Sequence, residues 1–214
     1  MPDSLPPPEK RACEDYMKMA QKQKLAADPR PRRLLPVAEL KANLTKHDGA
    51  WEHLTIYSAI FRHYLDHTTD AQHDPDLDGM AQRALSVANL LGRHWDSGNV
   101  IHIVHLVLGQ VALAQNDLAQ AVAQLHLAAQ TPGSPQLNSF GPNMALAERL
   151  LRLNQGKEVI TYIRECKRFW VTDMGRAQEW ISSLELGVNP DFGGNLDYGV
   201  EREPTADAPI KEVE

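Results

Sequence analysis

The segment NVIHIVHLVLGQVALAQNDLAQAVAQLHLAAQTPG, residues 99–133, decides the fold. Its first half, residues 100–114, is apolar almost all round, which predicts a helix at the centre of the protein. Asp117 follows a polar turn, and its spacing to Gln120 is that of a capping box. The next helix carries an apolar stripe at helical spacing, formed by Leu118, Ala121, Val122, Leu125 and Ala128. The segment therefore predicts two antiparallel helices joined by a tight turn at residues 115–117.

Residues of this pair resemble the tetratricopeptide repeat, a helical hairpin whose stacked copies bury a continuous core. The resemblance is carried by Leu108, Gly109, Ala112, Ala121, Leu125 and Ala128. Three positions depart from the repeat: His105 stands where Trp is common, Ala112 where Tyr is common, and Pro132 comes one residue early. Gly109 is expected where a neighbouring backbone comes close.

The same spacings recur 38 residues further along the chain. Gly109, Ala121, Leu125 and Ala128 are matched by Ala147, Val159, Ile163 and Cys166. The standard repeat is about 34 residues long. The excess falls in the segment 131–144, which predicts a second hairpin preceded by an inserted loop.

Helical apolar patterns lie on both sides of the central pair. They predict helices over residues 36–46, 48–67, 74–91, 142–153, 157–170 and 173–186. Asp48 is expected to cap the second of these, the segment 68–74 to be a polar loop, and Met174 to face inward from the last helix, which closes the stack. The predicted fold class is all-α, a tetratricopeptide-like stack of helical hairpins (an α-solenoid) with a C-terminal capping helix.

Charge differs between the start of the chain and the rest. Residues 1–46 carry ten Lys or Arg against six Asp or Glu, and residues 47–214 carry twelve against twenty-two. We expect a basic, partly disordered and partly helical arm over 1–46, a helical domain over 47–198 and an acidic disordered tail over 199–214. The last part of the domain, residues 189–198, is expected to pack back on the helices in extended form.

Composition limits the compartment and the class of partner. Cys13 and Cys166 lie far apart and fit neither a disulfide framework nor a zinc knuckle. No run of about 18 apolar residues predicts a membrane span, and the start of the chain lacks a secretory signal. We expect a cytoplasmic protein without membrane contact, and its acidic body argues against nucleic acid as the main ligand.

A closer resemblance covers residues 85–198. The segments GNVIHIVHLVLGQVAL, TPGSPQLNSFGPNM, CKRFW and PDFGGNLDY resemble those of uncharacterised bacterial proteins described only as tetratricopeptide-containing. The resemblance implies a helical repeat fold with a shared loop and tail. It implies no activity.

The segment 131–144 is the first candidate site. Prolines and glycines stiffen its backbone, and its polar side chains either read a partner's polar groups or fix the segment's own turns. The second candidate is the inner face of the central helix, where an apolar groove must be filled by this chain's own ends or by an apolar partner segment. The candidate partner-binding residues are Asn99, Leu106, Gln110, Leu113, Gln136, Asn138, Ser139, Phe140 and Asn143.

Histidine pairs suggest a metal site. His63 and His67 are spaced i, i+4, and His102 and His105 i, i+3, so that each pair shares a helix face. No carboxylate completes a recognisable ligand set, so the sequence assigns no metal and no cofactor. Catalytic motifs are also lacking, and no catalytic residue is assigned.

Three functions remain open from the sequence. The first is a protein- or peptide-interaction module that uses the groove and the 131–144 loop. The second is an enzyme or a small-ligand or metal-binding protein with a site near Asn99, His102, His105 and Asn138. The third is a structural subunit of a larger assembly, tethered by residues 1–46.

Overall fold

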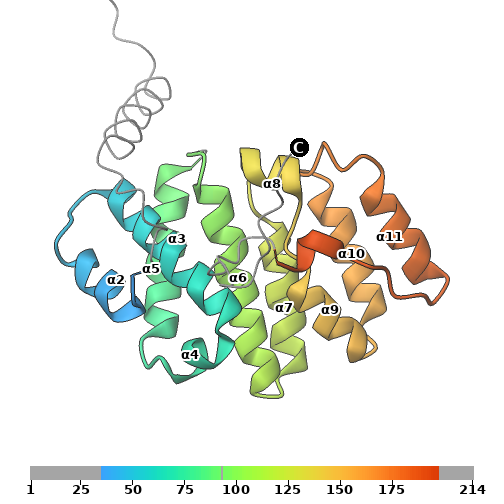
Figure 1. Ribbon diagram of the computed structural model, residues 1–214, viewed down its shortest axis with the longest axis horizontal. Coiled ribbons are helices and arrows are strands. Elements are labelled where there is room, and N and C mark those ends of the chain that lie inside the picture. The colour runs from blue at the N-terminus through green and yellow to red at the C-terminus, as the bar shows by residue number, and fades with distance from the viewer. Residues whose placement is uncertain (1–34, 93, 198–214) are drawn as a thin grey trace, which may run out of the picture. The chain divides into compact units, whose positions relative to one another are not determined.

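The computed structural model describes residues 35–92 and 94–197, which are helical and contain no strand (Figure 1). The elements are α2 (Val37–Leu44), α3 (Ala50–Asp66), α4 (Thr68–His73), α5 (Leu77–Leu91), α6 (Ser97–Ala114), α7 (Leu118–Ala129), α8 (Pro135–Phe140), α9 (Ala145–Arg152), α10 (Gly156–Cys166), α11 (Arg176–Glu185) and the 3-10 helix η1 (Gly193–Leu196). The expectations for residues 1–34 and for the tail over 199–214 lie outside the described residues.

The central hairpin forms as predicted. Asn116 turns the chain with a positive φ of 61°, and the Asp117 carboxylate accepts a hydrogen bond from the backbone N–H of Gln120 over 2.9 Å. A Cβ on Gly109 would lie 3.4 Å from the carbonyl oxygen of Ala121 and 2.4 Å from Cδ2 of Leu146. The tight contact at Gly109 is therefore with the Leu146 side chain, which any larger residue would displace, while the expected neighbouring backbone lies at ordinary van der Waals distance.

Helix α6 lies at the centre of the described helices. It begins at Ser97, three residues before the predicted start, and contacts α3, α4 and α5 as well as α7, α8 and α9 (Figure 1). Within the described residues it is also the single helix with the length and apolar composition of a membrane span, although 78% of it is buried inside the protein. That burial is typical of a helix in a protein core.

The helices before α6 follow the predicted pattern with two corrections. The inner face of α3 is buried as expected, at Leu54, Ser58, Phe61 and Leu65. Asp48 does not cap this helix, because Gly49 occupies the cap position and no side chain bonds there. The polar loop predicted over 68–74 is wrong, because residues 68–73 form α4, which contacts α6 and buries Ala71. Helix α2, in residues that the sequence analysis assigns to the arm, packs against α3.

The helices after α7 include the second hairpin, α9 and α10. The residues that match the first hairpin at the 38-residue spacing are all fully buried: Ala147, Val159, Ile163 and Cys166. Helix α11 begins at Arg176, so the inward orientation predicted for Met174 is wrong. Met174 lies in the preceding turn with a positive φ of 52° and is 91% exposed.

The last described segment packs back on the helices. Phe192 is buried against Trp180, with ring centroids 5.0 Å apart in an edge-on arrangement. The backbone carbonyl of Asn195 accepts a hydrogen bond from the N–H of Met144 over 2.8 Å at the start of α9. The segment is not extended throughout, because residues 193–196 form η1.

Candidate functional site

The segment 131–144 is an ordered insertion rather than an open loop. Its centre is α8, which begins at Pro135, where the missing N–H of proline leaves no helix bond unmade. The Ser134 hydroxyl accepts a hydrogen bond from the N–H of Leu137 over 2.9 Å and so caps this helix. Leu137 is fully buried and anchors α8 in the core.

Polar side chains fasten the insertion to the start of α6. The Ser134 hydroxyl donates to Oδ1 of Asn99 over 2.7 Å, and Nδ2 of Asn99 lies 3.3 Å from Oε1 of Gln136. The same Nδ2 donates to Asp96 over 2.8 Å, and the Thr131 hydroxyl donates to the carbonyl of Gly98 over 2.7 Å. The structure thus brings together two of the predicted partner-binding residues, Asn99 and Gln136. Asn99 is only 2% exposed, so its hydrogen bonds are used inside the protein, where they fix the position of α8.

The other end of the insertion is held by the last described segment. Nδ2 of Asn195 donates to the carbonyl oxygens of Phe140 and Pro142, over 2.8 and 2.9 Å. Asn143 is fully buried, and its Nδ2 donates to the carbonyl of Leu196 over 3.3 Å. The carbonyl of Asn143 accepts the Tyr162 hydroxyl over 3.0 Å. Asn143, a predicted partner-binding residue, therefore contacts the interior of this chain.

Asn138 connects the insertion to the link between α10 and α11. Its Oδ1 accepts the backbone N–H of Val171 over 3.0 Å, and its carbonyl accepts the hydroxyl of Thr172. The link and α8 are seen side by side in Figure 1. Asn138 thus fixes two surface segments, 33 residues apart in sequence, relative to each other.

These two segments carry exposed apolar side chains. Phe140 is 59% exposed, Val171 74% and Met174 91%, and Ser139 beside Phe140 is also exposed. We call Phe140, Val171 and Met174 the apolar rim. The sequence analysis identified Phe140 but missed Val171 and Met174. The sequence did offer one signal, the glycine at position 175, because glycine favours turns. In the structure Gly175 has a φ of 89° and the helix begins after it.

The predicted groove on α6 is covered by the protein itself. Leu106 is fully buried, Gln110 is 4% exposed, and Leu113 is partly buried against the core. The hydroxyl of Thr68, at the start of α4, donates to Oε1 of Gln110. Helices α3, α4 and α5 contact this side of the central hairpin, so the α6 face is occupied by this chain.

His102 and His105 form hydrogen bonds in the interior. Nδ1 of His102 donates to the carbonyl of Ala128 over 2.9 Å, and Nε2 accepts the N–H of Asn143 over 3.1 Å. Four residues after Ala128 stands Pro132, which has no N–H, so His102 satisfies a carbonyl that the helix cannot. Burial lowers the pKa of His102 to about 4. Burial also lowers the pKa of His105, whose Nδ1 lies 2.7 Å from Oε1 of Gln124.

The second histidine pair lies near the surface of α3. The rings of His63 and His67 are stacked with centroids 4.3 Å apart, Nε2 of His63 lies 2.8 Å from Oδ2 of Asp70, and Nδ1 of His67 donates to the carbonyl of His63. Among residues 35–92 and 94–197, no three His, Cys, Asp or Glu side chains are grouped so as to hold a metal ion.

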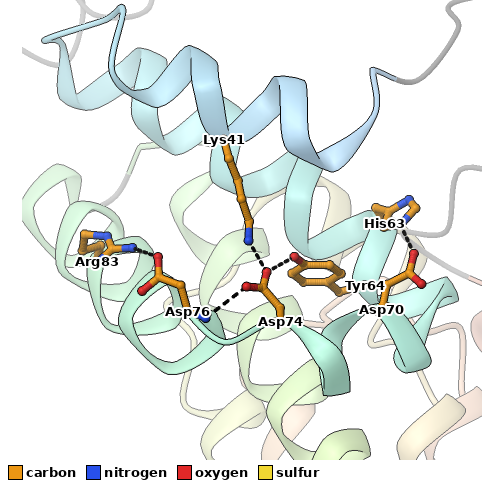
Figure 2. A network of polar contacts seen from close by, with 7 residues as sticks. All are labelled: Lys41, His63, Tyr64, Asp70, Asp74, Asp76 and Arg83. Atoms are coloured by element: carbon orange, nitrogen blue, oxygen red, sulfur yellow. Dashed lines mark hydrogen bonds and ion pairs between the residues drawn. The ribbon is translucent and has the colours of Figure 1, made fainter.

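A buried carboxylate lies at the centre of a network that the sequence analysis did not anticipate (Figure 2). Asp74 accepts hydrogen bonds from Lys41 of α2, from the hydroxyl of Tyr64 and, over 3.0 Å, from the N–H of Asp76. Its side chain is 4% exposed. Burial by itself would raise the pKa of Asp74, but the bonds from Lys41 and Tyr64 outweigh this effect and lower it. Burial and the bond to Asp74 raise the pKa of Tyr64.

This network fixes α2 against the segment between α4 and α5. Every oxygen of the Asp74 carboxylate has a donor, and Figure 2 shows Lys41 reaching down from α2 to it. Asp76 continues the network to Arg83 over 2.5 Å at the surface. Tyr64 is 2% exposed and the Asp74 side chain 4%, so the centre of the network is buried between helices, while Asp76 and Arg83 extend it to the surface.

Comparison of the chain with protein-family models, with curated proteins and with solved structures finds no match.

Proposed function

We propose that this protein is a protein- or peptide-interaction module, and that it binds an apolar segment of a partner protein through the apolar rim. The observation that carries the proposal is the exposure of Phe140, Val171 and Met174 on two segments that Asn138 fastens together. Single exposed apolar residues are common on protein surfaces. Here the insertion is held at its two ends by buried hydrogen bonds, and the link that carries Val171 and Met174 is fastened to it by the two bonds of Asn138.

Rigidity of the rim favours binding because a preformed surface loses little conformational entropy when a partner docks. The Asn99 network holds one end of the insertion and Asn195 holds the other. Met174 adds a second sign, since a non-glycine residue with positive φ costs free energy and such residues cluster at functional positions. A partner that buries the Met174 side chain would offset that cost.

We further propose that the helices form a tetratricopeptide-like stack. Two hairpins, α6–α7 and α9–α10, carry matching positions 38 residues apart, and the matched residues are buried in both. Helix α10 contacts α7, and α11 contacts α10, which is the neighbour-to-neighbour packing of helical repeats. Because the face of α6 is covered, the partner surface lies on the insertion and the α10–α11 link rather than in a groove at Leu106. We also propose that the protein is bacterial and lies in the cytoplasm.

The test begins with a photo-crosslinking amino acid at position 140, and with the same group at Leu90 of α5 as a matched control, because Leu90 is also exposed, at 76%. The protein crosslinked from position 140 is then purified, and its binding to the whole chain is measured by titration calorimetry. Burying one large apolar side chain contributes about 2 kcal/mol, so F140S combined with V171S is expected to weaken binding by at least about tenfold.

The control substitution L90S is expected to leave the affinity within about twofold. Equal affinity for the F140S/V171S variant and the unchanged protein would contradict the proposed surface. The same conclusion follows if L90S weakens binding as much as the rim variant does.

A further inference from the structure

His126 forms a bridge between α7 and α10 that the proposed function does not use. It projects from α7, and its Nε2 lies 2.9 Å from Oε2 of Glu158, while its Nδ1 lies 3.0 Å from Oε2 of Glu165. The two glutamates are seven residues, about two turns, apart on α10. One imidazole therefore spans two turns of the neighbouring helix.

The chemistry of the bridge depends on one proton. An ionised carboxylate can only accept hydrogen bonds, so both bonds form only when both ring nitrogens carry hydrogen and the ring is an imidazolium. A neutral ring has one bare nitrogen, which would face a carboxylate oxygen at about 3 Å without a hydrogen between them. The carboxylates meet opposite nitrogens of the ring, so they do not converge on a shared metal position.

We propose that His126, Glu158 and Glu165 form a proton-dependent lock between α7 and α10, closed while the imidazole is protonated and weakened when it becomes neutral. We call this group the α7–α10 lock. It joins the first hairpin to the second where α7 contacts α10. The His126 side chain is 25% exposed, so solvent screens the bridge only in part.

Arg168, His102 and His105 are charged or titratable groups on the elements around this contact. Arg168, two residues after the end of α10, donates to the carbonyl of Ala129 over 2.7 Å and to Oε1 of Gln130 over 3.1 Å, and arginine stays charged. On α6, burial lowers the pKa of both His102 and His105, so these rings are neutral near pH 7.

The direction of the pH effect follows from the bridge. Burial alone would lower the pKa of His126, but its bonds with Glu165 and Glu158 outweigh burial and raise it. A group whose pKa is higher in the folded than in the unfolded chain stabilises the fold fully below the unfolded value, near 6.5 for histidine. That contribution is lost as the pH rises through the folded pKa.

The lock is tested on the whole chain by NMR titration of the His126 ring. We expect its pKa to lie above 6.5 and to fall in E158Q and in E165Q, with the largest fall in the double variant. Amide exchange of α10, corrected for intrinsic rates, is expected to lose protection between pH 6 and pH 8.5, by up to about tenfold for each unit of pKa elevation.

H126Q keeps a hydrogen-bonding side chain that does not titrate, so its α10 amides are expected to show no such loss. H73Q is the matched control, because His73 is exposed and bonds within its own helix, and it should behave like the unchanged protein. A His126 pKa at or below 6.5, or the same loss of protection in H126Q, would overturn the lock.

Discussion

The Nε2 atom of His102 accepts a hydrogen bond from the backbone N–H of Asn143, 41 residues away in sequence, over 3.1 Å. Nδ1 of the same ring donates to the carbonyl of Ala128, so the two main-chain partners hold the ring neutral with its hydrogen on Nδ1. His102 thereby joins α6 to the end of α7 and to the entrance of α9. Its ring is fully buried and has no nitrogen left for a metal or a substrate.

Replacing His102 by leucine is expected to lower the free energy of unfolding by about 2–5 kcal/mol, because the carbonyl of Ala128 and the N–H of Asn143 would both lose a buried partner. Urea denaturation at pH 7.5 measures the change. H73L, at an exposed position of α4, is the control and should change stability by less than about 0.5 kcal/mol. A similar small effect of H102L would contradict the structural role of this ring.

His102 also predicts sensitivity to acid. Its pKa of about 4 in the folded protein lies below the ordinary value of 6.5, so the neutral ring favours folding. The contribution is complete above about pH 6.5 and is lost as the pH falls towards the folded pKa. Between pH 7.5 and pH 5 the loss from this ring is about 2 kcal/mol. Urea denaturation at both values should show this loss in the unchanged protein and a smaller one in H102Q; equal losses would refute the assignment.

Gly141 ends α8 beside the indole of Trp170. Its backbone, at φ 87° and ψ −174°, belongs to a region that essentially only glycine adopts, and an added Cβ would lie 2.5 Å from Cε2 of Trp170. G141A is expected to destabilise the protein by at least about 2 kcal/mol in thermal or urea unfolding. In G194A the new methyl group meets nothing within 4 Å, so that variant should remain within about 0.5 kcal/mol. The prediction fails if the two variants are equally stable.

Asp74 is expected to hold α2 in place. D74N removes the charge that pairs with Lys41 and should lower the free energy of unfolding by about 1–3 kcal/mol, with faster amide exchange in α2 than in α7. The control is D76N, because the ion pair of Asp76 with Arg83 is exposed and contributes little. Since the pKa of Asp74 is lowered, its contribution is present above about pH 4 and lost below it. Unchanged α2 exchange in D74N would count against this role.

The helical character of the chain was predictable because its signals are local. The period of apolar residues places Leu125 and Ile163 on buried faces, and Asp117 caps a helix through Gln120, three residues further on. Helices α4 and α8 were missed because each has six residues and buries a single side chain, Ala71 or Leu137. A pattern of period 3.6 needs more turns than that to be recognised.

The candidate site was predictable only in part. The polar residues of 131–144 were identified by type and segment length, but the roles of Asn99 and Asn143 as buried connectors were not visible in the sequence. Val171 and Met174 were missed because exposure depends on where α10 ends and α11 begins relative to α8. That relation is set by the bonds of Asn138 to residues 33 and 34 positions further on.

The amino-acid sequence by itself determined the longer helical segments and the faces of these helices that avoid water, because both depend on residues within a few turns of each other. Only the tertiary structure decided how the polar groups pair. His102 pairs with Asn143, 41 residues away, and Lys41 pairs with Asp74, 33 residues away. It also decided which apolar side chains remain outside. Such pairings follow from helix packing, in which a small rotation of one helix exchanges one buried partner for another.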